Sequence, residues 1–102
     1  MLRFDNNGAF LGADFVCEGT VNAADVLPRR VLEIAVIGGA HRVSLAHNHP
    51  FGTPIPSSDD VSLTSTLCSV LMSAEIRLES HYIVAGQLCN VIDAIEMREA
   101  QE

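Results

Sequence analysis

Residues 43–60 read VSLAHNHPFGTPIPSSDD, and this stretch decides the fold because it joins an apolar run to a stiff loop and then to a helix start. The run over 41–47 is short, bounded and mostly apolar, which is typical of an interior strand. Three prolines stiffen the loop that follows, compared with a Gly/Ser loop of the same length. Ser57 or Ser58 is then expected to cap a helix, because serine is among the preferred N-cap residues.

The helix that begins here carries acidic residues in its first turn and an apolar face beyond it. Asp59 and Asp60 suit that turn because the helix dipole favours anions at its N-terminus. The residues expected to supply the core face are Val61, Leu67, Val70, Leu71 and Ala74.

The segments on either side of this stretch complete an α/β pattern. The expected elements are strands at 2–4 and 9–17 about an Asn-Asn-Gly turn, a helix from Pro28 to Ile37 ended by Gly38-Gly39, closing strands at 76–78, 82–85 and 88–92, and a charged, frayed helix at 93–102. Strands at both ends with two intervening helices predict an α/β or α+β sandwich.

Length and composition narrow the class of protein. A chain of 102 residues suits one domain with one core, and 48% hydrophobic residues are too many for an intrinsically disordered chain. No apolar run approaches the roughly 20 residues that cross a bilayer. The first residues lack the apolar segment and cleavage site of a secretory signal, so a cytoplasmic location is expected.

The charge balance argues against nucleic-acid binding, and the cysteines argue against a disulfide framework and a thiolate zinc site. Six Lys+Arg against 13 Asp+Glu give a formal charge of −7, and all the cations are arginine, which argues against nucleic-acid binding. The sequence has an odd number of cysteines, Cys17, Cys68 and Cys89, and none of them shows C-x-x-C spacing. Neither a disulfide framework nor a thiolate zinc site is therefore indicated. We expect these thiols to be buried as small hydrophobes.

The residues that suggest chemistry lie at the two ends of the proline-rich loop. His47 and His49 project to the same side of a strand, and neutral imidazoles are good zinc ligands. The loop can fold the next helix back over the strand end, which would present Ser57 and make Asp60 the third ligand. Two alternatives stay open: Ser57-x-x-Asp60 also forms a capping box, and this ligand set also suits iron, nickel or manganese.

The same residues resemble a known family. His47-Asn48-His49-Pro50 with the later Ser57 and Asp60 is similar to the H-x-H-x7-S-x2-D motif of the RadC-like branch of the JAB/MPN (JAMM) zinc metalloproteases. Gly19-Thr20-Val21-Asn22 and His81-Tyr82-Ile83-Val84 extend the resemblance over nearly the whole chain. It implies one cytidine-deaminase-like α/β/α sandwich over 1–102 with a mixed central sheet. It also implies zinc on His47, His49 and Asp60, with Ser57 near the oxyanion.

The chain departs from the family pattern at the catalytic base. The resemblance implies a general-base glutamate upstream of Leu2–Phe4, and no residue stands there, so the family's N-terminal element is expected to be missing. Arg30 and Phe51 also replace the family's glutamate and serine in the P-R-E and H-N-H-P-S-G segments. Glu18 is the one glutamate before Pro28, and we interpret it as a solvated charge at a strand end. The glutamates expected to be exposed elsewhere are Glu33, Glu75 and Glu79.

Three functional hypotheses follow. The first is a zinc metallohydrolase of the JAMM type that cuts an amide or isopeptide bond in a peptide or protein, weakened by the missing glutamate. The second is a non-catalytic metal-binding or scaffold module of the same fold. The third, a DNA-repair factor, is the poorest because of the negative charge. An uncovered sheet edge near Leu2–Phe4 also predicts a homodimer.

Overall fold

A mixed five-stranded sheet with two α-helices forms the part of the chain that the computed structural model describes, residues 1–17, 22–49 and 52–95. In chain order the elements are β1 (Leu2–Phe4), β2 (Phe10–Ala13), the 3-10 turn η1 (Ala23–Asp25), α1 (Pro28–Ile37), β3 (Arg42–Asn48), α2 (Ser58–Met72), β4 (Arg77–Ala85) and β5 (Leu88–Asp93). The α/β fold with a mixed sheet, expected from the sequence, is confirmed and agrees with the JAB/MPN architecture.

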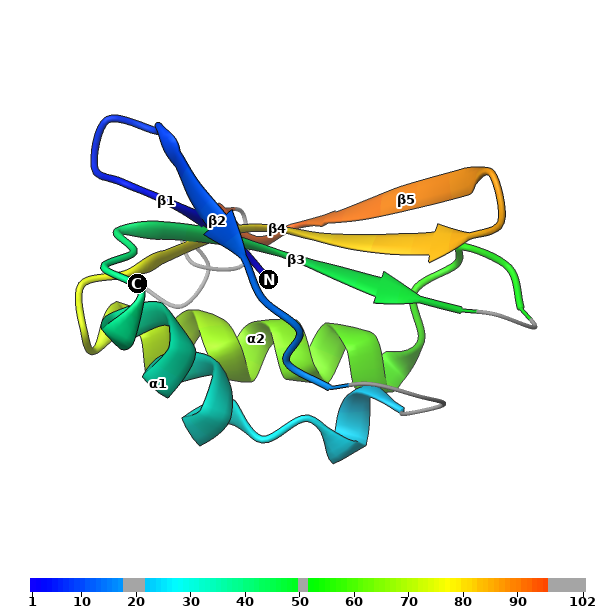
Figure 1. The fold of residues 1–102 in the computed structure, drawn as a ribbon. Helices are drawn as coiled ribbons and strands as arrows, with labels where there is room; N and C mark the ends of the chain where they lie inside the picture. Colours follow the sequence, from blue (N-terminus) through cyan, green and yellow to red (C-terminus); the bar gives the residue numbers. More distant parts are fainter. Residues whose placement is uncertain (18–21, 50–51, 96–102) are drawn as a thin grey trace.

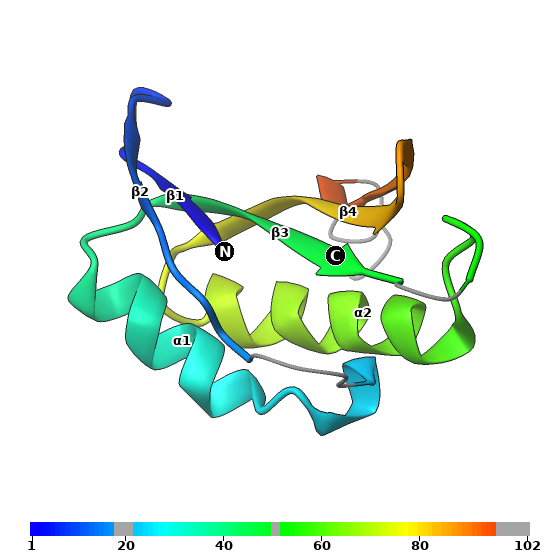
Figure 2. The same ribbon diagram turned by 45° about the vertical axis from the view of Figure 1, so that its right-hand side comes forward.

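The strand order is β2-β1-β3-β4-β5. β3 and β4 are parallel, with α2 as the connection between them, and the other neighbouring pairs are antiparallel. Figures 1 and 2 show α1 and α2 on the same face of the sheet. The end of β3 and the start of α2 therefore lie at one edge of the α2–sheet interface, where the two halves of the histidine–aspartate motif can meet.

The first half of the chain follows the sequence expectations closely. β1 and β2 form the predicted hairpin, and Gly8 takes a φ of 85° in its turn, a conformation that glycine tolerates. α1 has the predicted bounds, with proline at its first position. It ends at Gly38-Gly39, where Gly39 has a φ of 68°. Strand β2 spans only Phe10–Ala13 and is shorter than the strand expected over 9–17.

The core face of α2 differs in part from the expected one. Leu67 and Leu71 are buried as predicted, but Val61 is 41% exposed. Ala74 is also exposed and lies beyond the helix. A spacing of four residues places Leu63, Leu67 and Leu71 on one stripe toward the sheet, and this stripe turns Val61 toward solvent. The stripe also buries Thr64 and Cys68, which the apolar pattern did not identify.

The two closing strands expected at 76–78 and 82–85 are one strand, β4. β4 runs through the polar residues Glu79, Ser80 and His81, which lie between the two expected strands, with a register irregularity opposite Val43 and Ser44. His81 is 1% exposed because it faces α2, where Thr64 satisfies it. A buried polar side chain with a partner therefore continues the strand rather than ending it.

The expectation for the cysteines is wrong at two positions. Cys68 is buried, whereas Cys17 and Cys89 are exposed. Cys89 lies on β5, which is at the margin of the sheet, and Cys17 lies in the irregular segment after β2. Within the described ranges, neither helix has the length and hydropathy that crossing a bilayer requires. The tail helix expected over 93–102 does not begin at Asp93, which is the last residue of β5. The part of this tail from 96 onward lies outside the described residues, as do Glu18, Pro50 and Phe51.

Candidate metal centre

The end of β3 supplies the two histidines of the centre. His47 is the penultimate residue of β3, and His49 follows the strand directly. The backbone N–H of His49 still donates to the carbonyl of Val84 on β4 at 2.8 Å, so the alternation of side chains continues past the strand end. Both imidazoles therefore face the first turn of α2, and each side chain is about one-fifth exposed, at 20% and 19%.

The first turn of α2 supplies the carboxylate. Ser57 is the N-cap, and its Oγ accepts the N–H of Asp60 at 3.0 Å. In return, the N–H of Ser57 donates to Oδ2 of Asp60 at 2.8 Å, which completes a capping box. The capping box predicted as an alternative is thus present, and it fixes the carboxylate of Asp60, which is fully buried, over the end of β3.

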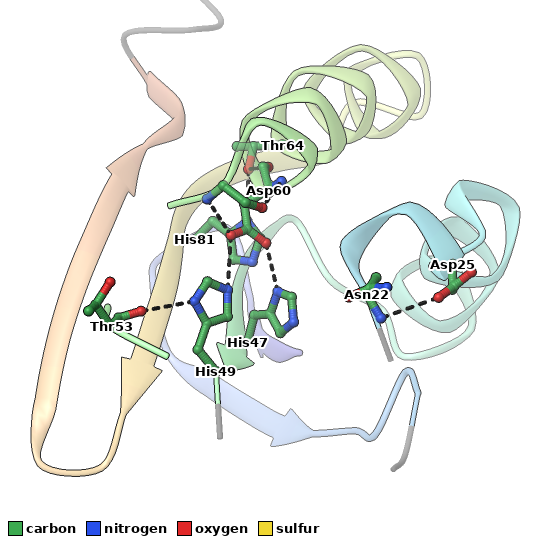
Figure 3. A network of polar contacts seen from close by, with 9 residues as sticks. Asn22, Asp25, His47, His49, Thr53, Asp60, Thr64 and His81 are labelled. Atoms are coloured by element: carbon green, nitrogen blue, oxygen red, sulfur yellow. Dashed lines mark hydrogen bonds and ion pairs between the residues drawn. The ribbon is translucent and has the colours of Figure 1, made fainter. Parts of the chain in front are cut away.

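The three candidate ligands converge as the sequence predicted. Nδ1 of His47 lies 2.9 Å from Oδ1 of Asp60, and Nε2 of His49 lies 3.0 Å from Oδ2. Figure 3 shows both imidazoles pointing toward this carboxylate. One ligand atom from each residue lies within 4.8 Å of the others, so the group could hold a metal ion. For comparison, bonds of 2.0–2.1 Å in a tetrahedral zinc site place its donors about 3.3 Å apart.

The hydrogen bonding around these atoms fits a cation. Nδ1 of His49 lies 3.0 Å from the carbonyl oxygen of Thr53, which can only accept, so Nδ1 carries a proton. In a neutral imidazole, Nε2 then turns a lone pair toward the carboxylate of Asp60. Oδ1 of Asp60 is buried and has no hydrogen-bond partner among the described residues, although Nδ1 of His47 is close to it. Acceptor atoms this close together are stabilised by a shared proton or a shared metal cation.

The carboxylate of Asp60 is held in its charged form. Burial opposes the charge, but hydrogen bonds from Ser57 and the nearby imidazoles of His47 and His49 outweigh it and lower the pKa of Asp60. An ionised carboxylate and neutral imidazoles are the forms that bind divalent metals.

A buried pair, Thr64 and His81, lies beside the centre and was not identified as functional from the sequence. The hydroxyl of Thr64 donates to the backbone carbonyl of Asp60 at 2.7 Å and lies 2.8 Å from Nδ1 of His81. The ring of His81 is stacked with that of His47, with centroids 6.0 Å apart. Burial lowers the pKa of His81 to about 4, so this imidazole is neutral at physiological pH.

A cleft of about 630 Å³ opens in front of the candidate ligands. Ser57 lines it and is exposed. Its apolar wall is supplied by Phe15, Val16, Val26, Leu45 and Leu63. A mostly apolar cleft with a few convergent polar groups is the usual form of a binding site.

The cleft lining includes two further carboxylates among the described residues, Asp14 and Asp59. Asp14 forms an ion pair with Arg3. The glutamates expected to be solvated do not line the described part of the cleft: Glu75 is exposed, and Glu33 and Glu79 are half-buried. Glu18 lies outside the described residues, so its assignment as a solvated charge stays a prediction.

Comparison with known proteins agrees with this geometry. The RadC-like JAB domain family matches residues 1–94. Similar proteins are the UPF0758 protein Smlt0399 of Stenotrophomonas maltophilia (strain K279a), 40% identical over 81% of this chain, and the UPF0758 protein YkfG of Escherichia coli (strain K12), 39% identical over 85%. The chain covers 36% of the first of these relatives and 55% of the second. This protein therefore belongs to the RadC-like JAB family.

Proposed function

We propose that this protein is a JAMM-type metallohydrolase that binds one zinc ion at His47, His49 and Asp60 and cuts an amide or isopeptide bond. The observation that carries the proposal is the convergence of two imidazoles and one buried carboxylate beside an open cleft. Three protein ligands with a position left to solvent are typical of catalytic zinc sites, whereas structural zinc sites are closed by four.

Each residue has a role in this proposal. Thr53 orients the imidazole of His49, and Ser57 orients the carboxylate of Asp60 through its backbone N–H. Ser57 lines the cleft, so its hydroxyl can donate to a substrate oxygen in place of the carboxylate of Asp60. A donor of this kind contributes about 3 kcal/mol to oxyanion stabilisation. When bound, zinc supplies hydroxide at neutral pH and polarises a carbonyl.

The substrate that suits this cleft is a peptide or protein with an apolar side chain near the cut bond. Phe15 is 81% exposed at the cleft and offers an aromatic surface for such a side chain.

Metal content tests the site. Protein stripped with a chelator and dialysed against zinc is expected to retain one zinc per chain. His49→Ala is expected to lose it, while His41→Ala, an exposed histidine outside the cleft lining, retains it. Parallel loading with iron, nickel and manganese identifies the preferred metal. Equal zinc in all three proteins would refute the proposal.

Hydrolysis of a quenched fluorescent peptide library tests the activity. The expected result is turnover that a chelator abolishes, that added zinc restores and that His49→Ala lacks. Zinc binding without turnover of any peptide or isopeptide substrate would instead favour the non-catalytic module of the same fold.

The proposal includes a cytoplasmic homodimer. Two thiols, Cys17 and Cys89, are exposed, a state that a reducing compartment preserves. β1 is not the open edge expected near Leu2–Phe4, because β2 and β3 pair on its two sides. The described sheet ends instead in β2 and β5, and an open strand edge is a template for pairing with another copy.

A further inference from the structure

We propose that Thr64 and His81 are positioning residues that fix Asp60 and His47 and thereby raise the affinity of the centre for its metal. This inference rests on the proposed function, because it assumes that the centre binds a divalent cation. Neither residue is a ligand in it: His81 is not part of the group whose donor atoms converge, and a threonine hydroxyl offers no charge to the cation.

The direction of the hydrogen bonds defines the pair. Thr64 has one hydroxyl hydrogen, and the carbonyl oxygen of Asp60, 2.7 Å away, can only accept it. The contact of 2.8 Å between Oγ1 of Thr64 and Nδ1 of His81 must then be donated by His81. His81 is therefore the Nδ1-protonated tautomer, and the relay runs from His81 through Thr64 to Asp60.

This relay joins two elements that carry the centre. A threonine that bonds the carbonyl four residues back is common inside one helix. Here the same hydroxyl also accepts from His81 on β4, so the first turn of α2 is attached to the sheet at the level of Asp60. Asp60 is thus held on its carboxylate side by Ser57 and on its backbone side by the relay.

The relay also reaches a histidine of the centre. The rings of His81 and His47 are close to parallel, at 12°, and their strands are paired, since Leu45 lies opposite His81 and His47 opposite Ile83. Figure 3 shows Thr64, Asp60, His81 and His47 as one cluster. All the polar groups of the relay are buried, so losing one bond leaves a partner unsatisfied and allows the ligands to shift.

The test compares zinc affinities by competition with a chromogenic chelator. Thr64→Val keeps the side-chain shape and removes the hydroxyl, and it is expected to bind one zinc about 10- to 100-fold more weakly than the unmodified protein. Thr66→Val is the matched control on the exposed side of the same helix, and its affinity is expected to stay within about 2-fold.

Conservative variants separate positioning from a general loss of packing. Thr64→Ser restores the hydroxyl and His81→Asn restores an N–H near the position of Nδ1, so both are expected to recover most of the affinity that Thr64→Val and His81→Leu lose. Cobalt in place of zinc adds a visible absorption spectrum, whose shift in Thr64→Val reports altered coordination geometry. The double variant Thr64→Val with His81→Leu is expected to be little worse than either single one.

The outcomes distinguish this inference from the proposed function. Zinc affinity and cobalt spectrum unchanged in folded Thr64→Val and His81→Leu would overturn the positioning role, even if both variants are less stable. If Thr64→Val and His81→Leu both fail to fold, Thr64→Ser provides the test, because it keeps the hydroxyl. A zinc affinity of Thr64→Ser well below that of the unmodified protein would then overturn the positioning role. An unmodified protein that binds no more zinc than His49→Ala would instead overturn the proposed function itself.

Discussion

His81 illustrates what a single residue does in this core. It is a polar side chain within the sheet, and its bond to Thr64 offsets the cost of removing it from water. A bonded neutral imidazole is compatible with the interior, whereas an imidazolium there is not, and burial lowers the pKa of His81 to about 4. The free energy of unfolding is therefore expected to depend on pH through His81.

Stability is expected to fall on acidification through His81. The unfolded chain takes up a proton at this residue below about pH 6.5, the ordinary pKa of histidine, whereas the folded chain does so only near its lowered pKa of about 4. The free energy of unfolding thus decreases between those values, by at most about 3 kcal/mol. Urea titrations with chelator at pH 7 and pH 4.5 measure this. His81→Asn is expected to flatten the dependence, and an equal loss in both proteins would contradict the assignment.

The candidate ligands could be predicted from the sequence, but their supporting pair could not. His47 and His49 follow the period of two of a strand, and Ser57 with Asp60 follows the spacing of a helix cap, so local rules place all four. The bond between Thr64 and His81 joins residues 17 positions apart, and it depends on the register of β4 against β3. No local rule specifies that register.

At the scale of elements, Ser57 has two roles at the N-terminus of α2: it caps the helix, and it is the proposed hydrogen-bond donor to a substrate oxygen. Ser57→Ala removes the acceptor for the N–H of Asp60 and is expected to lower the free energy of unfolding by about 1 kcal/mol. Turnover is expected to fall about 100-fold, because the hydroxyl donor to the substrate is also lost. Ser58→Ala, at the first exposed position of the helix, is the control for both measurements. Unchanged turnover in Ser57→Ala would limit Ser57 to capping.

Arg3 joins three elements and provides a second prediction at this scale. Its Nε lies 2.5 Å from Oδ2 of Asp14, just after β2, and its Nη1 donates to the carbonyl of Gly38 at the end of α1 at 2.8 Å. Arg3→Gln is expected to lower the free energy of unfolding by about 1.5–3 kcal/mol, because a half-buried charged hydrogen bond is lost. Arg29→Gln removes an exposed pair with Glu33 and is expected to cost less than about 1 kcal/mol. Urea unfolding that ranks the two variants in the opposite order would contradict this.

Element boundaries were predictable where turn residues mark them and not where burial decides them. Pro28 and Gly39 bound α1 through their own backbone preferences. β4 continues through a polar run because His81 is satisfied by another element, so only the tertiary structure shows that the strand is continuous.

For the whole molecule, the formal charge of −7 bears on which partners it attracts. Arg3 and Arg29 are each paired with a carboxylate, and Arg42 donates to the carbonyl of Asn6. Three of the five arginines in the described residues are thus bonded to groups of the protein itself, and the negative net charge opposes binding to a phosphate backbone. This charge is compatible with the peptide or protein substrate that we propose.

The sheet edges lead to the prediction of a homodimer in solution. β5 presents Leu88 at 63% and Val91 at 50% exposure, and it carries no charged residue before Asp93, so it has little of the protection that edge strands usually show. Light scattering is expected to give the mass of two chains at micromolar concentration. Val91→Lys, which places a charge on this strand, is expected to shift the mass toward one chain. A monomer at high micromolar concentration in the unmodified protein would contradict the prediction.

The most direct test of the whole account is anomalous diffraction at the zinc absorption edge from crystals grown with zinc. One strong peak per chain is expected, at bonding distance from Nδ1 of His47, Nε2 of His49 and the carboxylate of Asp60, with no such peak in His49→Ala. Clear density for these side chains with no peak between them, or a zinc peak elsewhere on the chain, would contradict it.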